Sequence, residues 1–164
     1  MKSILKYASP FLALPMAACV GLLGPSLEPG QSTVADVDAR LGRVTEVRSL
    51  ADGEAMRYYS HQPWGYETFA ARIGADGRLR TLEQVLTEEN VAKLHAGVSR
   101  SSEVRELLGP PYTIDAFRRM QREVWSYKLR PTGWKGKDLF VQFSADGVVR
   151  EIYLMDDDQQ FGAG

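Results

Sequence analysis

The fold is decided by two stretches that repeat each other, PGQSTVADVDARLG at residues 29–42 and AGVSRSSEVRELLG at residues 96–109. They align at an offset of 67 residues, with identities at Gly30/Gly97, Ser32/Ser99, Val37/Val104, Leu41/Leu108 and Gly42/Gly109. Further along the chain the offset grows to 68 and then to 70, where Ala75-Asp76-Gly77 lies on Ala145-Asp146-Gly147. Because such self-similarity marks a duplicated structural unit, we expect two copies of one fold.

Each copy is predicted to begin with a helix. Ser32 and Ser99 are placed to cap its N-terminus. Gly42 and Gly109 are placed to end it, as glycines commonly do. Apolar residues at helical spacing lie between them, at Val34, Val37 and Leu41 in the first copy and at Val104, Leu107 and Leu108 in the second.

Strand-like runs follow each helix, at 44–50, 54–60, 66–73 and 78–85 and at 112–117, 123–129, 138–143 and 148–154. Alternation in the last run directs Val148, Ile152 and Leu154 to one side and Val149 and Tyr153 to the other. A further helix capped by Thr87 is predicted over residues 87–95. The expected class is α+β: two tandem units, each with one or two helices packed on an antiparallel meander of three to four strands.

The composition is that of an ordinary, nearly neutral protein. Among 164 residues, 20 are basic and 21 acidic, and 44% are apolar. No strongly basic stretch suits a nucleic acid, so we expect no nucleic-acid partner. The single cysteine, Cys19, can form no intramolecular disulfide. Residues 96–155 carry 10 basic against 7 acidic residues, so the second copy is the better candidate for contact with a membrane or an acidic partner.

The N-terminus predicts export and lipid attachment. Lys2 and Lys6 precede an uncharged run at 7–18 that is too short to span a membrane and fits a cleaved signal. Met16-Ala17-Ala18-Cys19 resembles the lipobox of bacterial lipoproteins, in which the cysteine carries a lipid such as palmitate, and Val20 after it implies the outer membrane. The alternative is an ordinary cleaved signal that leaves a free thiol. We therefore expect a signal peptide at 1–18, a tether at 19–28, repeats at 29–86 and 87–155, and a polar tail at 156–164.

A series of motifs in the second copy points to a known family. They are G-x-S-x-x-x-x-V-x-x-L-L-G-P-P at 97–111, Trp125-x-Tyr127, Leu139-x-x-x-Phe143 and Asp146-Gly147. This copy resembles the SmpA/OmlA domain of the BamE-like outer-membrane lipoproteins over residues 87–154, and the first copy resembles it less. The tandem is also similar in architecture to the β-lactamase inhibitory proteins, which hold a partner on a concave sheet. The resemblance implies a periplasm-facing protein whose partners are envelope proteins, the outer-membrane assembly machinery among them.

Residues that could serve catalysis are few. His61 lies in a predicted turn and His95 at the end of a predicted helix, and neither has the spacing of a zinc site or of a nucleophile motif. Cys19 is no nucleophile once it is acylated. The glycines at 133–136 do not form a phosphate-binding loop. We expect no enzymatic activity, no cofactor and no metal site.

Two sets of residues are candidates for partner binding. Trp64 and Trp134 lie between the second and third predicted strands of their copies, where each either folds back over its sheet or anchors a partner. Arg118, Arg119 and Arg122 flank Met120 in a predicted hairpin turn. They form either a solvated tip or a contact for anionic headgroups or an acidic partner.

Three functions remain open from the sequence. The leading hypothesis is a lipid-anchored envelope scaffold that supports outer-membrane protein assembly or envelope integrity through protein contacts. The alternative is an inhibitor of a periplasmic or secreted hydrolase, which predicts Trp64 and Trp134 on one concave surface. An enzyme is the third, and it would require a pocket that gathers a histidine with a serine and an acid.

Overall fold

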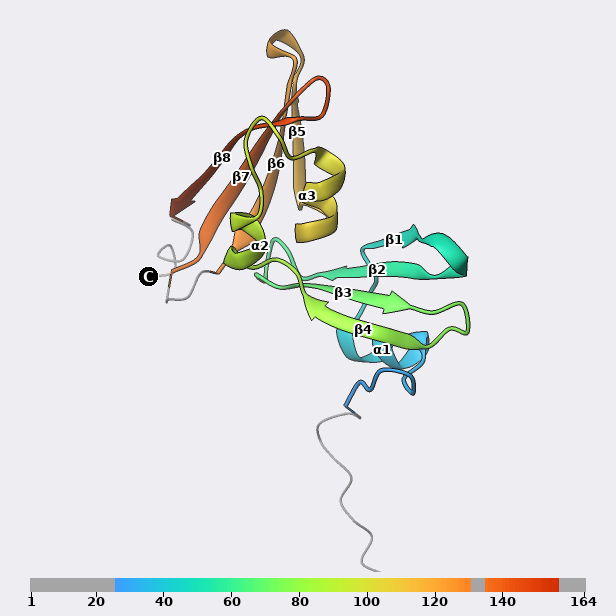
Figure 1. Cartoon of the computed structure of the whole chain (residues 1–164). Coiled ribbons are helices and arrows are strands. Elements are labelled where there is room, and N and C mark those ends of the chain that lie inside the picture. Colours follow the sequence, from blue (N-terminus) through green and yellow to red (C-terminus); the bar gives the residue numbers. More distant parts are fainter. Residues whose placement is uncertain (1–25, 131–134, 157–164) are drawn as a thin grey trace, which may run out of the picture.

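The computed structural model describes residues 26–130 and 135–156, which form two units of one design (Figure 1). The first unit consists of α1 (Val34–Leu41), β1 (Glu46–Ser49), β2 (Ala55–Ser60), β3 (Thr68–Ile73) and β4 (Leu79–Gln84). The second consists of α2 (Glu88–Ala92), α3 (Ser101–Leu108), β5 (Thr113–Phe117), β6 (Arg122–Leu129), β7 (Lys137–Ser144) and β8 (Val149–Asp156). The predicted α+β class is confirmed.

The duplication is confirmed at the level of backbone hydrogen bonds. Each unit has one antiparallel sheet, in the order β1-β2-β3-β4 and β5-β6-β7-β8. A bridge between Thr33 and Arg78 precedes the first helix, and Arg100 and Val148 form its counterpart in the second unit. The amide of Gly30 donates to the carbonyl of Leu79, and the equivalent bond runs from Gly97 to Val149, both at 2.7 Å. Two similar halves therefore fold with the same register.

The structure confirms the predicted C-terminal ends of α1 and α3 but not their predicted N-terminal caps. Gly42 and Gly109 end α1 and α3, each with a positive φ. The predicted caps Ser32 and Ser99 are wrong, because each hydroxyl instead accepts from the backbone N–H of the residue four positions earlier. Thr33 caps α1 in a reciprocal capping box with Asp36, and the hydrogen bond that the backbone N–H of Thr33 donates to the Asp36 carboxylate lowers the pKa of that carboxyl. A serine two residues before a helix thus fixes the preceding turn.

The predicted alternation of β8 is wrong at Val149. The register shifts between Gln142 and Phe143, so that Val149 pairs with Phe143 and is fully buried in the core. The first sheet has the same irregularity at Arg72/Ile73. A bulge adds one residue to one strand and reverses the side to which the residues beyond it point.

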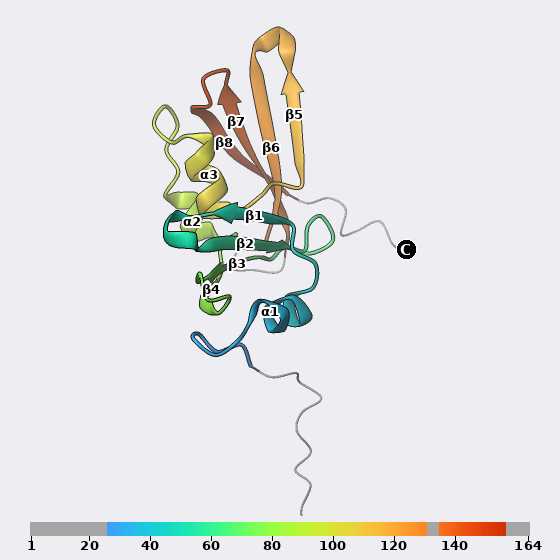
Figure 2. The same cartoon turned by 90° about the vertical axis from the view of Figure 1, so that its right-hand side faces the viewer.

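The elements stack in four layers: α1, the first sheet, the pair α2 and α3, and the second sheet (Figures 1 and 2). The core between α1 and the first sheet contains Val37, Tyr59, Ala71, Ile73 and Leu79. The larger core lies between α2, α3 and the second sheet, and its residues include Leu94, Val104, Leu108, Trp125, Tyr127, Leu139, Val141 and Phe143. The second unit holds more buried apolar surface and thus the larger share of the hydrophobic stabilisation.

The two units meet where α3 ends on the first sheet. The backbone of Gly109 lies so close to this sheet that a Cβ there would be 2.7 Å from Thr68 Cγ2 and 3.2 Å from Tyr58 Cδ1. Arg105 forms an ion pair with Glu46 of β1 and lies 4.9 Å from the ring centroid of Trp125. A single arginine therefore links the first sheet to the core of the second unit.

In the first unit, the position equivalent to Arg105 forms its hydrogen bonds within that unit. Asp38, which aligns with Arg105, accepts two hydrogen bonds from Arg57 and one from the Tyr59 hydroxyl at 2.7 Å. Burial would raise the pKa of Asp38, but the hydrogen bonds from Tyr59 and Arg57 hold it below its ordinary value. Burial raises the pKa of Tyr59 to about 12. The same helix position thus binds residues of its own unit in the first copy and pairs with a residue of the other unit in the second copy.

The glycines that end α1 and α3 allow a matched test of the contact between the units. Gly42 and Gly109 have φ values of 84° and 78°, but a Cβ at Gly42 would meet nothing within 4 Å. Gly42→Ala should therefore cost only backbone strain, about 1–3 kcal/mol. Gly109→Ala should cost about 1–3 kcal/mol more, because the added methyl must displace Thr68 or Tyr58. Urea denaturation of both variants measures the difference, and equal losses would contradict a close contact at Gly109.

Candidate binding surface

The hairpin between β5 and β6 projects at the far end of the second unit (Figure 1). Its turn is a short 3-10 segment, Arg118–Met120, followed by Gln121 in the left-handed region with a φ of 51°. The Gln121 N–H donates to the carbonyl of Arg118 at 3.2 Å and closes the turn. The structure thereby confirms that the three arginines lie at a hairpin tip.

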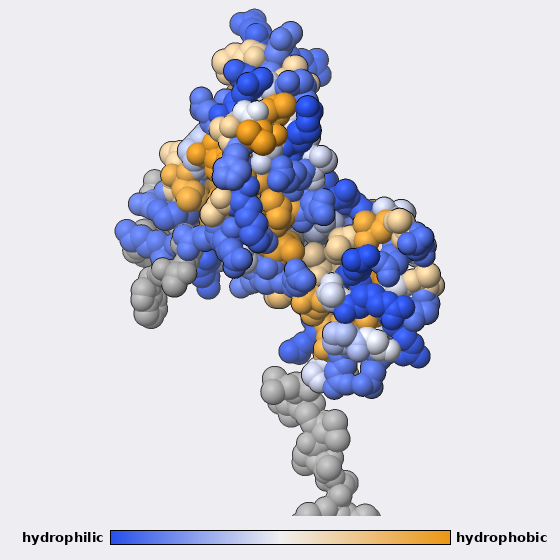
Figure 3. All heavy atoms as spheres, in the orientation of Figure 1, coloured by the Kyte–Doolittle hydropathy of each residue, from blue (hydrophilic) through white to orange (hydrophobic). Residues whose placement is uncertain are grey.

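The tip combines positive charge with apolar side chains. Arg118 and Arg119 are exposed and Arg122 is half-buried, and no acidic side chain in the described ranges pairs with any of them. Phe117 and Met120 beside them are 46% and 61% exposed. In Figure 3 the top of the molecule, where this hairpin lies, is mostly hydrophilic with paler apolar atoms among it. Unpaired guanidinium groups next to exposed apolar surface suit an acidic partner.

The loop between β2 and β3 presents the second candidate, Trp64. This side chain is 94% exposed, so it does not fold back over its own sheet. The loop is closed by the Gly65 N–H, which donates to the carbonyl of His61 at 2.8 Å. Gln62 ties it to the second unit, because its Oε1 accepts from the Lys128 N–H at 2.7 Å. The Trp64 side chain therefore projects into solvent from a loop that hydrogen bonds hold in place.

The corresponding loop of the second unit lies against this one. The Arg130 guanidinium lies 4.4 Å from the ring centroid of Tyr66, and Tyr66 also packs against the backbone of Gly136. Arg130 and Gly136 flank residues 131–134, so Trp134 lies outside the described residues, as does Cys19. The equivalent loops of the two units therefore adjoin at their described ends.

The structure does not bring Trp64 and the arginines together. Arg122 begins β6 and Lys128, which binds the Trp64 loop, is near its end. Six residues of extended strand separate them by about 20 Å. The two candidate surfaces are at opposite ends of the second sheet.

Neither histidine lies in a catalytic arrangement. His61 is 3.8 Å from Glu67 and stacks edge-on against Phe69, but no hydroxyl in the described chain forms a hydrogen bond to its ring. His95 is exposed and follows α2, which ends at Ala92 rather than at the predicted position. Within the described ranges, no group of three or more His, Cys, Asp or Glu side chains could hold a metal ion.

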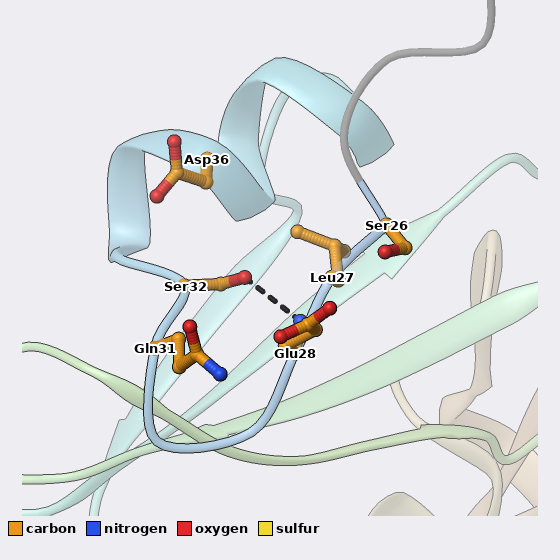
Figure 4. A pocket seen from close by; sticks show the side chains of 6 residues that line it. All are labelled: Ser26, Leu27, Glu28, Gln31, Ser32 and Asp36. Carbon is orange, nitrogen blue, oxygen red and sulfur yellow. Dashed lines mark hydrogen bonds between the residues drawn. The ribbon is translucent and has the colours of Figure 1, made fainter. Parts of the chain in front are cut away.

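Two hollows among the described residues are lined by no histidine. One of about 350 Å³ lies where the described chain begins, where the Ser32 hydroxyl accepts from the backbone N–H of Glu28 (Figure 4) and the Asp36 carboxylate accepts from Thr33. Another of about 270 Å³ lies behind the hairpin tip and is lined by Arg118, Arg122, Glu123 and the β7–β8 turn. None of the helices described is long and apolar enough to cross a membrane.

Sequence reasoning missed one surface, the side of the second sheet that faces away from α3. Phe140 and Tyr153 stack there with ring centroids 5.2 Å apart, next to Met155, which is 56% exposed. The register of β7 and β8 places all three on this side. The alternation of side chains along β8 could have indicated this surface. The bulge, however, changes which residues of the strand point to the same side.

Comparison with known proteins agrees with the fold of the second unit. Residues 83–153 match the family model described as the outer membrane protein assembly factor BamE domain. A search of curated protein sequences finds no match. A solved structure of a DUF4309 family protein, YjgB from Bacillus subtilis subsp. subtilis str. 168, aligns over 80% of this chain and 82% of its own at 16% identity, with a TM-score of 0.31. The resemblance read from the motifs at 97–147 is confirmed, and the second unit of this chain is a BamE-like domain.

Proposed function

We propose that this chain is a non-enzymatic, lipid-anchored binding protein of the bacterial envelope, attached to the outer membrane through Cys19 and facing the periplasm. The observation that carries the proposal is the match of residues 83–153 to the domain of the outer membrane protein assembly factor BamE. Its partners would be envelope proteins engaged in outer-membrane assembly or envelope integrity. The two units contact each other at Gly109 and at the Arg105–Glu46 ion pair, and together they offer surfaces that can hold such a partner.

The position of the hairpin tip favours a protein partner over lipid headgroups. The blue start of the described chain lies at the end of the molecule opposite to the β5–β6 hairpin in both views (Figures 1 and 2). The seven residues from Cys19 to Ser26 can span about 25 Å at most. An anchor at Cys19 would therefore hold the first unit near the membrane and direct the tip towards the periplasm.

Lipid attachment predicts a label that depends on one residue. Cells that express the full chain and grow with an alkyne-tagged fatty acid should yield a labelled protein, and Cys19→Ala should lose the label completely. Two acyl chains hold a protein stably on a membrane, so the Cys19→Ala protein should also leave the membrane fraction. A wild-type protein that carries no label but reacts with a thiol reagent would indicate an ordinary cleaved signal instead.

If the arginines of the hairpin tip bind a partner, reversing their charge should weaken that binding. Arg118→Glu/Arg119→Glu should lower the yield of cross-linked envelope proteins about tenfold, because unpaired tip charges steer an acidic partner. Arg40→Glu/Arg43→Glu is the matched control, with the same change of charge at two exposed arginines of the first unit. Quantitative mass spectrometry of the cross-linked products measures both. Equal yields in the two variants would remove the tip from the binding surface.

The inhibitor hypothesis remains the alternative, favoured by the exposure of Trp64 and by the adjoining loops at Tyr66 and Arg130. It predicts that the purified chain inhibits a periplasmic hydrolase at micromolar concentration. Trp64→Ala should weaken that inhibition at least about tenfold, since exposed aromatic anchors dominate such interfaces. Val98→Ala, at another exposed apolar residue, should change nothing. A panel of hydrolases with no inhibition by the wild-type chain would eliminate this alternative.

A further inference from the structure

One face of the first sheet is covered by helices of the second unit. This face, which points away from α1, carries Tyr58, Ala70 and Val85, and all three are buried. α3 reaches it through Gly109 and Arg105, and Asn90 of α2 donates to the carbonyl of Val85 at 2.7 Å. The chain itself thus shows that this kind of sheet face receives a helix pair.

The duplication identifies the equivalent face on the second sheet. Tyr58 pairs across the strands with Ala70, and Ala70 with Glu83. In the second sheet the corresponding row is Ser126, Phe140 and Tyr153. Next to it, Met155 takes the position of Val85. This face points away from α2 and α3, and no helix of the described chain lies on it (Figure 2).

The chemistry of this face differs from that of its covered counterpart. Large and small residues are exchanged: Tyr58 and Ala70 in the first sheet become Ser126 and Phe140 in the second. At the edge Tyr153 takes the position of Glu83 and Met155 that of Val85, and these two side chains are 40% and 56% exposed. Glu151 beside them is exposed and has no partner among the described residues. The face offers an apolar row with a free carboxylate at one side.

We propose that this face binds an amphipathic α-helix of a partner protein, which lies on it as α3 lies on the first sheet. The helix would place apolar residues on Phe140, Tyr153 and Met155 and a basic residue opposite Glu151. The proposal rests on the proposed role as a binding protein, and it assigns a second contact that is separate from the hairpin tip.

A second copy of this chain fits the face less well. Its α1 would be the equivalent helix, with Asp38 in the place of Arg105. The residue that corresponds to Glu46 is Thr113, which pairs with Ser126 as Glu46 pairs with Tyr58, so the ion pair between the units would have no counterpart. Asp38 is in addition already bound by Arg57 and Tyr59. A helix from another protein can supply the charge that α1 does not.

Neighbouring residues of β8 provide a matched test. Tyr153 and Leu154 are 40% and 42% exposed, yet Tyr153 pairs with Phe140 on the proposed face and Leu154 pairs with Leu139 on the core side. A photoreactive phenylalanine analogue is placed at position 153, 154, 119 or 120 of the full chain in cells, one position in each variant. Cross-linked peptides are identified by mass spectrometry, and circular dichroism of the purified variants verifies the fold.

The proposal expects a cross-link from position 153 to a helical segment of another protein, with at least several-fold less from position 154. Glu151→Arg should lower the yield from position 153 about threefold, as loss and reversal of a partly exposed ion pair does. Equal yields at 153 and 154, a peptide of this same chain, or a non-helical segment would each overturn it. Cross-links from positions 119 and 120 without any from 153 would overturn it while the proposed function stands, and none from any of these positions would overturn both.

Discussion

The burial of α2 and α3 between two sheets is the contact on which the whole arrangement depends. Their inner side forms the large core of the second unit, around Leu108 and Trp125, and their outer side covers Tyr58 and Ala70 of the first sheet. The close approach requires Gly109, since a side chain there would collide with Thr68. Because one helix pair packs against two sheets, separation of the units would expose apolar surface on both.

Duplication preserved the backbone and changed the side chains at the points of contact. The hydrogen bonds that tie each helix to its sheet recur pair by pair in the two units. At one helix position, however, Asp38 binds Arg57 and Tyr59 within the first unit, while Arg105 reaches across to Glu46. Side-chain differences between the two copies also give the second sheet a face that carries the stacked rings of Phe140 and Tyr153. A repeated fold thus acquired an internal interface at one end and an open face at the other.

The described part of the chain presents three surfaces of different chemistry. The second unit carries the arginine tip at one end of its sheet, and at the other end Arg130 contacts Tyr66 of the first unit, with the aromatic sheet face between them. Each surface has a different chemistry: charge at the tip, an exposed tryptophan at the loops, and aromatic rings on the face. Separate surfaces of different chemistry suit the proposed role as a binding protein.

The sequence by itself determined the repeated unit, the ends of the helices at Gly42 and Gly109, and the hairpin that carries Arg118 and Arg119, because glycine conformation, apolar spacing and turn residues act over a few positions. It did not determine the roles of Ser32 and Ser99 or the side to which Val149 points, since a capping hydroxyl has two possible donors nearby and a bulge reverses the alternation. Only the tertiary structure decided that Gly109 also admits a neighbouring sheet and that Tyr153 lies on an open face. Such contacts join residues distant in the chain, and their geometry follows from how whole layers pack.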